Sequence, residues 1–260
     1  MPEVILRRHG AIGRVIISNP KKKNAMSLAM WQALPGAIAG FDADPQIRVI
    51  VLEGDGDEAF ISGADISQFE DNRSDAQAQE RYNAAVAAAY AAPGACSKPV
   101  VAKIAGICMG GGLGLAAACD LRFCRDDARF RMPASRLGLG YSASGVNRFM
   151  QVFGLQNTLD IFFSARIFDA TEARMMGFVS RVAPRESFDR VVDEWCGYVS
   201  DNAPLVLRAV KKTANALLPM PDPRALAEAH AAIAACFASD DYREGVRAFS
   251  EKRKPNFRGI

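Results

Sequence analysis

The chain has 260 residues, of which 50% are hydrophobic and 23% charged, and its formal net charge is +3. This length is enough for one or two domains with a large buried core, and the composition excludes a mainly disordered or fibrous protein. So small a net charge gives no argument for a nucleic-acid partner.

Cysteine and histidine usage narrows the class further. The six cysteines, at positions 96, 108, 119, 124, 196 and 236, form no CxxC pair and have no neighbouring histidines. We therefore expect no metal site and interpret them as buried thiols in a reducing compartment. The two histidines, His9 and His230, have no serine or cysteine partner in a nucleophile motif, which argues against a Ser-His-Asp or Cys-His hydrolase.

The N-terminal sequence MPEVILRRHG lacks the successive zones of a signal peptide. The longest uncharged stretch, residues 104–119, is shorter than the roughly 20 residues that a membrane span needs. We expect a cytoplasmic protein that does not enter a membrane.

The first half of the chain alternates strand and helix patterns. Residues 4–6 and 14–17 predict a β-hairpin, and the β-branched runs 48–52 and 99–104 predict strands. Between the hairpin and the run 48–52, Ser27 can cap a helix that places five apolar residues on one face: Met30, Trp31, Leu34, Ile38 and Phe41. Pro35-Gly36 should kink or interrupt that helix.

A buried helix is expected over Gly112–Cys119 and a strand over 121–124, which completes an α/β pattern. From Ser187 onward no strand pattern remains. Helices are expected from Pro204 through Lys212, over 224–237, and over 240–252 with Pro255 as the stop. This helical region could be a second domain or an arm that packs on another subunit.

Two small-residue turns follow strands and could carry chemistry. One is Phe60-Ile-Ser-Gly-Ala-Asp-Ile66, and the other is Ala105-Gly-Ile-Cys-Met-Gly-Gly-Gly-Leu-Gly-Leu115. Each places backbone N–H groups at a helix N-terminus, and two such turns aimed at one point would make an oxyanion hole. Taken singly, the triple glycine could serve tight packing and the first turn could be an ordinary capped turn. Neither turn matches the dinucleotide or P-loop pattern.

In this order and spacing the motifs resemble the crotonase family, also called the enoyl-CoA hydratase/isomerase family. The matching segments run along essentially the whole chain: Asn19-Pro with Lys22 and Asn24-Ala25, SGADI, the GGG helix ending in Cys119-Asp120, Pro133 to Gly138, and Phe249 to Phe257. The resemblance implies an α/β fold, with a ββα spiral core over residues 1–186 and an α-helical trimerisation region over residues 187–260. It also implies a homotrimer or a hexamer built as a dimer of trimers, an acyl-CoA thioester substrate, and no separate cofactor.

The resemblance also assigns residues. The thioester carbonyl would accept hydrogen bonds from the backbone N–H groups of Ala64 and Gly111, both small so that the oxygen can approach. Coenzyme A would be bound by Lys22, Lys23, Ala25, Ala64, Asp65, Ile66, Phe249 and Lys252. For the basic run at 252–254, a solvated helix end is the alternative, and a nucleic-acid patch is a weaker one. For Asp65 the alternative is a helix cap.

The family's acid–base residues are missing. Hydratases of this family use two glutamates, and those positions hold Gly114 and Ala134 here. The position of an aspartate found in some isomerases and dehalogenases holds Ser142. Tyr141 matches a tyrosine of the methylmalonyl-CoA decarboxylases in the same family, although those enzymes carry a histidine at Ala64 and an acid at Gly114.

The candidate catalytic residues are therefore Ala64, Gly111, Tyr141 and Ser142. The hypothesis is an acyl-CoA enzyme that stabilises a thioester enolate, with hydration or isomerisation by unconventional groups, decarboxylation and hydrolysis left open as reactions. A non-catalytic acyl-CoA-binding protein is the alternative of another class. Tyr141 could also be a buried ring. Arg136 is expected to pair with a surface acid, with a clamp for a substrate carboxylate as the alternative, and Cys108 is expected to pack. We expect Gly111→Val to fill the oxyanion site without disturbing assembly.

Overall fold

The computed structural model describes residues 2–65, 76–216, 234, 237–253 and 255. The chain forms two compact units, one of Met1–Phe130 with Phe168–Leu218 and one of Arg131–Ile167 with Pro219–Ile260. These boundaries differ from the expected division after residue 186. That division separates an expected acyl-CoA-binding core from an expected trimerisation region, and it stays a prediction. Within the described ranges, no helix is long and apolar enough to cross a membrane.

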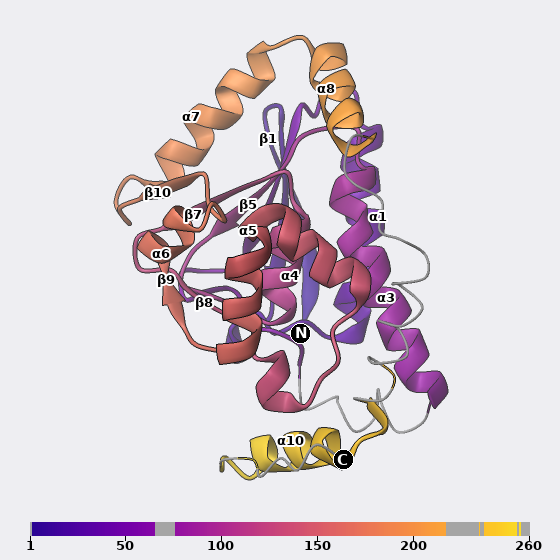
Figure 1. Ribbon diagram of the computed structural model, residues 1–260. Helices are drawn as coiled ribbons and strands as arrows, with labels where there is room; N and C mark the ends of the chain where they lie inside the picture. Colours follow the sequence, from indigo (N-terminus) through magenta and orange to yellow (C-terminus); the bar gives the residue numbers. More distant parts are fainter. Residues whose placement is uncertain (1, 66–75, 217–233, 235–236, 254, 256–260) are drawn as a thin grey trace. The chain divides into compact units, whose positions relative to one another are not determined.

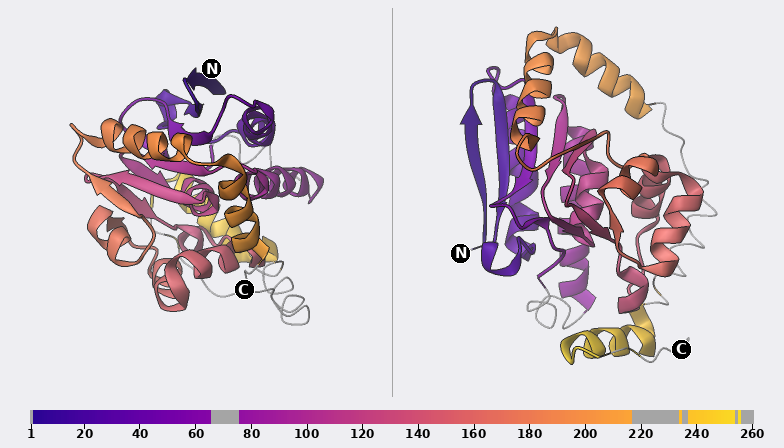
Figure 2. Two further views of the ribbon diagram at one scale, coloured as in Figure 1. Left: turned by 90° about the horizontal axis from the view of Figure 1, so that it is seen from above. Right: turned by 90° about the vertical axis from the view of Figure 1, so that its left-hand side faces the viewer.

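A six-stranded sheet forms the centre of the first unit, in the order β1-β2-β3-β5-β7-β10. The predicted hairpin is confirmed: β1 and β2 are antiparallel and form one edge of the sheet (Figure 2). The other strands run parallel to β2, and the β-branched runs of β3 and β5 are buried, as expected for a parallel sheet. The strands are β1 Glu3–His9, β2 Ile12–Ser18, β3 Val49–Gly54, β5 Val100–Ile104, β7 Leu121–Arg125 and β10 Arg181–Ala183.

A second, four-stranded sheet has the order β4-β6-β8-β9. Its strands are β4 Ala59–Ile61, β6 Ile107–Met109, β8 Arg129–Arg131 and β9 Phe168–Asp169. The buried helix α4 (Gly111–Ala118) follows β6 directly, close to the prediction, and the short helix α6 (Ala170–Met175) follows β9. The triple glycine, residues 110–112, therefore forms the start of α4 directly after β6.

Helices α1 (Leu28–Ala43) and α3 (Ala76–Ala95) pack side by side (Figure 1). The predicted cap is present, because the Ser27 hydroxyl accepts a hydrogen bond from the Met30 N–H at 3.3 Å. The expected interruption at Pro35 is wrong, since α1 continues through it. Leu34 and Ile38 on either side are almost fully buried, and their packing offsets the missing N–H. A 3-10 turn, η1 (Pro20–Lys22), precedes α1.

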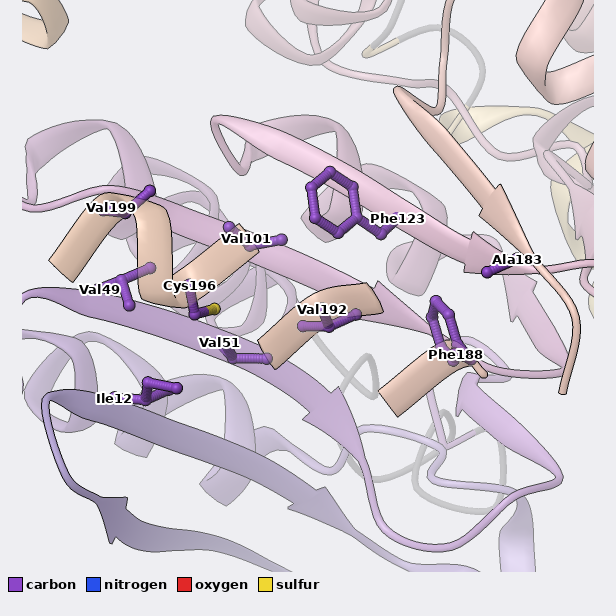
Figure 3. Close-up of a cluster of buried hydrophobic side chains, with 10 residues drawn as sticks. All are labelled: Ile12, Val49, Val51, Val101, Phe123, Ala183, Phe188, Val192, Cys196 and Val199. Atoms are coloured by element: carbon purple, nitrogen blue, oxygen red, sulfur yellow. The ribbon is translucent and has the colours of Figure 1, made fainter. Parts of the chain in front are cut away.

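Helix α7 (Phe188–Asp201) covers one face of the six-stranded sheet through a cluster of ten buried side chains (Figure 3). Four of them come from α7, at i, i+4, i+8 and i+11, and the others from the sheet: Ile12, Val49, Val51, Val101, Phe123, Ala183, Phe188, Val192, Cys196 and Val199. Helix α8 (Pro204–Ala216) follows, beginning at the predicted proline and extending past Lys212.

The second unit contains the 3-10 turn η3 (Ala134–Leu137), α5 (Ala143–Ser164) and α10 (Asp240–Ser250). Helix α5 is broken at Gly154, where φ is +73°. Helix α10 packs on η3 so closely that a Cβ at Gly245 would lie 2.5 Å from the Leu137 carbonyl oxygen. The last helix ends two residues before the predicted Lys252, and the expected helix over 224–237 falls mostly outside the described residues.

Candidate active site

The two turns predicted to carry chemistry lie at the ends of neighbouring parallel strands. Ile61 of β4 is paired with Cys108 of β6, and Ala64 and Gly111 each come three residues later. Because parallel strands end at the same edge of a sheet, this register brings the two turns together. A Cβ at Gly112 would lie 2.4 Å from the Ile61 carbonyl oxygen, so only glycine permits the observed approach.

The backbone N–H of Ala64 is directed away from the loop between β2 and α1 (residues 19–27), called the first loop below. Met26 donates its N–H to the Gly63 carbonyl at 2.9 Å and accepts the Asp65 N–H at 2.8 Å, which is the pattern of a parallel bridge centred on Ala64. In that pattern the central residue's own N–H faces the opposite side. Within the described residues, no group accepts a hydrogen bond from the Ala64 N–H.

The backbone N–H of Gly111 lies at the first turn of α4, where helical N–H groups have no partner inside the helix. The preceding carbonyl, that of Gly110, accepts the Gly114 N–H at 3.1 Å. This bond polarises the peptide group to which the Gly111 N–H belongs. No hydrogen bond from that N–H is found in the part of the chain that the structure describes, so two donors stand at one sheet edge.

Aromatic residues from α1 and α3 surround Gly111. The Tyr90 hydroxyl donates to the Gly111 carbonyl at 3.1 Å, and the Trp31 indole N–H donates to the Tyr82 hydroxyl at 3.1 Å. The rings of Trp31 and Tyr90 meet edge to face with their centroids 5.7 Å apart. Sequence reasoning placed Trp31 in the core and gave the two tyrosines no role, because their relation to Gly111 depends on how α1 and α3 pack.

The Trp31 ring changes the expected effect of Gly111→Val. A Cβ at Gly111 would lie 3.0 Å from Cζ2 of Trp31, so a valine would press into a buried indole. The substitution would disturb packing as well as the site, and it is therefore no clean test of the N–H donor. The small residue is required here by the Trp31 ring, rather than only by an approaching substrate oxygen.

The basic first loop is tied to the Ala64 turn. Lys22 donates to both carboxylate oxygens of Asp65, at 2.9 and 2.8 Å, and the Asp65 side chain is only 4% exposed. The Ser62 hydroxyl donates to the Lys22 carbonyl at 3.0 Å, and the Ser62 N–H donates to the Lys23 carbonyl at 3.1 Å.

For the predicted coenzyme A contacts, this means that Lys22 approaches Ala64 through its pairing with Asp65. Lys23 is exposed, and Ala25 is buried beside the loop. Ile66 lies outside the described residues, as do the nine residues after it, where Asp65 would act as a helix cap.

Tyr141 and Ser142 belong to the second unit. The half-buried Tyr141 ring meets Phe149 and Phe162 edge to face, with centroids 5.8 and 5.1 Å away. Ser142 caps α5, because its hydroxyl accepts the Gly145 N–H at 3.1 Å. The ring packing and the cap explain both residues locally, and their catalytic roles stay predictions.

The remaining candidates in this unit are on or near α10 and η3. Phe249 is half-exposed, and Lys252 is exposed just after the helix with a φ of +54°. Arg136 is also exposed, and among the described residues it forms no ion pair with the surface acid that was expected.

Neither position at which the resemblance places a hydratase glutamate holds a residue that can transfer a proton. Gly114 is buried in α4, and Ala134 is buried in η3. Cys108, next to the glycine turn, is fully buried, and burial raises the pKa of its thiol well above the ordinary value. It therefore packs as expected. The five cysteines in the described ranges are free and buried, and no group of three or more His, Cys, Asp or Glu side chains there could hold a metal ion.

The family model for enoyl-CoA hydratase/isomerase matches residues 7–259 of this chain. The chain belongs to the enoyl-CoA hydratase/isomerase family. A crotonyl-CoA hydratase of Syntrophomonas wolfei is 31% identical over 254 residues, which cover 98% of this chain and 97% of the relative. The family and the crotonase-like α/β fold expected from the motifs are thereby confirmed.

Solved structures agree with this membership. An enoyl-CoA hydratase/carnithine racemase from Magnetospirillum magneticum has a TM-score of 0.82 and 33% identity, covering 100% of this chain and 97% of that one. A methylmalonyl-CoA decarboxylase in complex with 2-nitronate-propionyl-CoA has a TM-score of 0.91 at 24% identity, covering 99% and 98%. At 24% identity, the likeness to the decarboxylase supports a shared fold and nothing more.

Proposed function

We propose that this enoyl-CoA hydratase/isomerase family member acts on an acyl-CoA thioester and stabilises its enolate at the N–H groups of Ala64 and Gly111. The observation that carries the proposal is the register of β4 and β6, which brings two N–H groups without partners in the described residues to one sheet edge. A thioester oxygen placed between them would gain negative charge as the enolate forms. One such donor is worth about 3–4 kcal/mol of barrier.

The chain supplies charge stabilisation without the usual proton transfer. The positive end of α4 adds to the Gly111 donor, whereas Gly114 and Ala134 provide no acid or base. Decarboxylation is a second candidate reaction because loss of CO₂ forms the enolate without a base. In that case the Tyr141 hydroxyl would be the group to orient the departing carboxylate. Hydrolysis, and hydration or isomerisation by unconventional groups, are the other reactions to test.

The nucleotide part of the substrate would be held by basic and aromatic side chains. We assign Lys22, Lys23 and Ala25 of the first loop with Asp65 and Ile66 to one part of coenzyme A, and Phe249 and Lys252 to its adenine and 3′-phosphate end. No separate cofactor or metal is included in this proposal. Assembly as a homotrimer, or as a hexamer of two trimers, is part of it and uses the helical region from residue 187.

The reaction is tested with four thioesters: crotonyl-CoA, a β,γ-enoyl-CoA, methylmalonyl-CoA and a β-keto acyl-CoA, with products followed by mass spectrometry. Conversion of any of them supports the proposed function, and conversion of methylmalonyl-CoA selects decarboxylation. Hydration of crotonyl-CoA at the rate of ordinary hydratases would contradict the argument from Gly114 and Ala134. Tight binding without conversion would select the non-catalytic alternative, and absence of binding would reject the thioester altogether.

A further inference from the structure

We propose that Tyr90 is a positioning residue for the Gly111 N–H. Its hydroxyl fixes a glycine that has no side chain of its own to hold it. This inference rests on the proposed function and adds to it the device that keeps one of the two donors in place. No sequence motif marks Tyr90, which lies 21 residues before Gly111 in an alanine-rich helix.

The need for such a device follows from the triple glycine. Three consecutive glycines have the greatest backbone freedom of any tripeptide, and Gly110 has a φ of +52°, in the left-handed region. An oxyanion donor contributes only if it is held in the productive geometry before the charge develops. A freely moving turn would lose part of that contribution, so the restraint must come from neighbouring elements.

Three contacts supply the restraint, one from each neighbour. Ile61 of β4 contacts Gly112 closely, and the Trp31 ring of α1 packs against Gly111. The Tyr90 hydroxyl of α3 adds a side-chain hydrogen bond, at 3.1 Å to the Gly111 carbonyl. The first two contacts prevent movement toward their own side, whereas the hydrogen bond adds an attraction toward α3 to the hold that helix α4 itself has on its first residue.

Tyr82 offers a matched control on the same helix. It lies eight residues before Tyr90, and its hydroxyl accepts the Trp31 indole N–H at 3.1 Å. It is buried, and its hydroxyl bonds the Trp31 side chain, whereas the Tyr90 hydroxyl bonds the glycine backbone directly. Tyr90→Phe and Tyr82→Phe therefore delete the same atom from the same helix, but only the first deletion removes a hydrogen bond to the backbone of the glycine turn.

The first readout is steady-state kinetics with whichever thioester of the panel is converted. Net loss of one hydrogen bond corresponds to about a 3- to 10-fold change. We expect Tyr90→Phe to lower kcat about 3- to 10-fold with KM changed less than about twofold. Tyr82→Phe should lower the thermal midpoint at least as much, because it leaves a buried indole N–H unsatisfied, while kcat changes less than about twofold.

The second readout requires no turnover. Butyryl-CoA labelled with ¹³C at the thioester carbonyl is bound to each variant, and the carbonyl stretching band is measured by difference infrared spectroscopy. In the native chain the band should move to lower frequency than in free butyryl-CoA. In Tyr90→Phe it should move less and broaden, and in Tyr82→Phe it should match the native chain. If Tyr90→Phe does not fold, Tyr90→Leu, which also lacks the hydroxyl, takes its place and should show the same reduced shift.

The outcomes separate the two proposals. A native shift that Tyr90→Phe leaves unchanged, or that both tyrosine variants reduce equally, overturns the positioning role and leaves the proposed function standing. A native chain that binds butyryl-CoA without any shift rejects the oxyanion site, and the positioning role with it.

Discussion

The Asn24 side chain makes three hydrogen bonds to the backbone in and around the loop beside the Ala64 turn. Its side-chain amide donates to the carbonyl oxygens of Asp55 at 3.0 Å and Ala59 at 2.8 Å, and its Oδ1 accepts the Asn19 N–H at 3.0 Å. The residue is 1% exposed and has a φ of +58°, a conformation that asparagine tolerates better than most residues. One side chain thus satisfies three backbone groups that a loop would otherwise leave buried and unpaired.

We expect Asn24→Ala to lower the free energy of unfolding by about 2–4 kcal/mol, since it leaves buried polar groups without partners and keeps a Cβ in the left-handed region without the polar side chain that makes this conformation tolerable. Urea titration followed by circular dichroism measures the loss. Asn24→Gly is the control, because it removes the same hydrogen bonds at a φ that glycine accepts freely. A loss below about 1 kcal/mol in both variants would contradict the assigned role.

The Ala64 donor can be removed with one substitution. Ala64→Pro deletes the N–H and should lower kcat about 100- to 1000-fold on the thioester that the chain converts. Ala64→Gly keeps the N–H and should lose far less. Equal kinetics for the two variants, with both correctly assembled by size-exclusion chromatography, would show that the Ala64 N–H does not contact the transition state.

At the scale of elements, α7 is anchored to the sheet by charges as well as by its apolar face. Glu53 of β3 accepts hydrogen bonds from Arg14 at 3.1 Å and from Lys103 at 2.8 Å, and all three side chains are at most 15% exposed. The two cations also pair with α7, Arg14 with Asp193 and Lys103 with Asp189. Glu53 is therefore the central anion of a network between sheet and helix.

We expect Glu53→Gln to lower the free energy of unfolding by about 2–4 kcal/mol, because two poorly hydrated cations lose their most buried counter-charge. Asp189→Asn, at the 81% exposed end of the network, should cost less than about 1 kcal/mol. Denaturant titration of both variants checks the order. A greater loss for Asp189→Asn would contradict the placement of Glu53 at the centre.

The same network predicts a pH dependence. The hydrogen bond from Lys103 lowers the pKa of Asp189 below its ordinary value of 3.8, although burial opposes the shift. Because the folded chain favours the carboxylate, its stabilisation is complete above the ordinary pKa and is lost as the pH falls through the lowered one. The stability difference between the native chain and Asp189→Asn should be constant from about pH 5 to 8 and shrink below about pH 4. A difference that persists undiminished at about pH 2 would contradict this assignment.

For the whole molecule, the helical region is expected to carry assembly. Helix α8 exposes Leu205, Val206 and Val210, each more than half accessible, while Lys211 on its other side donates to the carbonyls of Pro93 and Lys98. Leu207 of this helix packs against the buried cluster between α7 and the sheet, so the other large apolar side chains of α8 are left on the surface, whereas an amphipathic helix normally buries such residues. The exposed apolar side supports the proposed trimer.

We expect Val206→Glu to convert the trimer to monomers, since a charge in an apolar interface loses its hydration without gaining a partner. Lys212→Glu, which introduces the same acidic side chain at an exposed polar position of the same helix, should leave the assembly intact. Light scattering coupled to size-exclusion chromatography distinguishes the two results. A monomeric native chain would contradict the expected assembly, and a trimeric Val206→Glu would show that this face is not part of the interface.

Local patterns were enough to predict several elements and to single out the two turns. The hairpin, the strands expected over 48–52 and 99–104, and the helix capped by Ser27 all depend on side-chain periodicity and capping within a few residues, and these are properties of neighbours in the chain. The motifs identified the family, whose membership the matching family model confirms. The interruption expected at Pro35 was wrong, because its local cost was outweighed by burial that only the packed molecule provides, and helices α3, α5 and α7 were not predicted.

Tertiary structure alone decided what surrounds the candidate site. The pairing of Ile61 with Cys108, the Tyr90 bond to Gly111 and the Lys22–Asp65 pair join residues 21 to 47 positions apart, and no local pattern specifies such contacts. The sequence by itself determined the family and, through that resemblance, predicted which backbone N–H groups would bind an oxyanion and that Gly114 and Ala134 stand in place of the two glutamates. Only the folded chain determined which neighbours hold those groups, because a glycine has no side chain whose size or polarity would indicate the residues that pack against it.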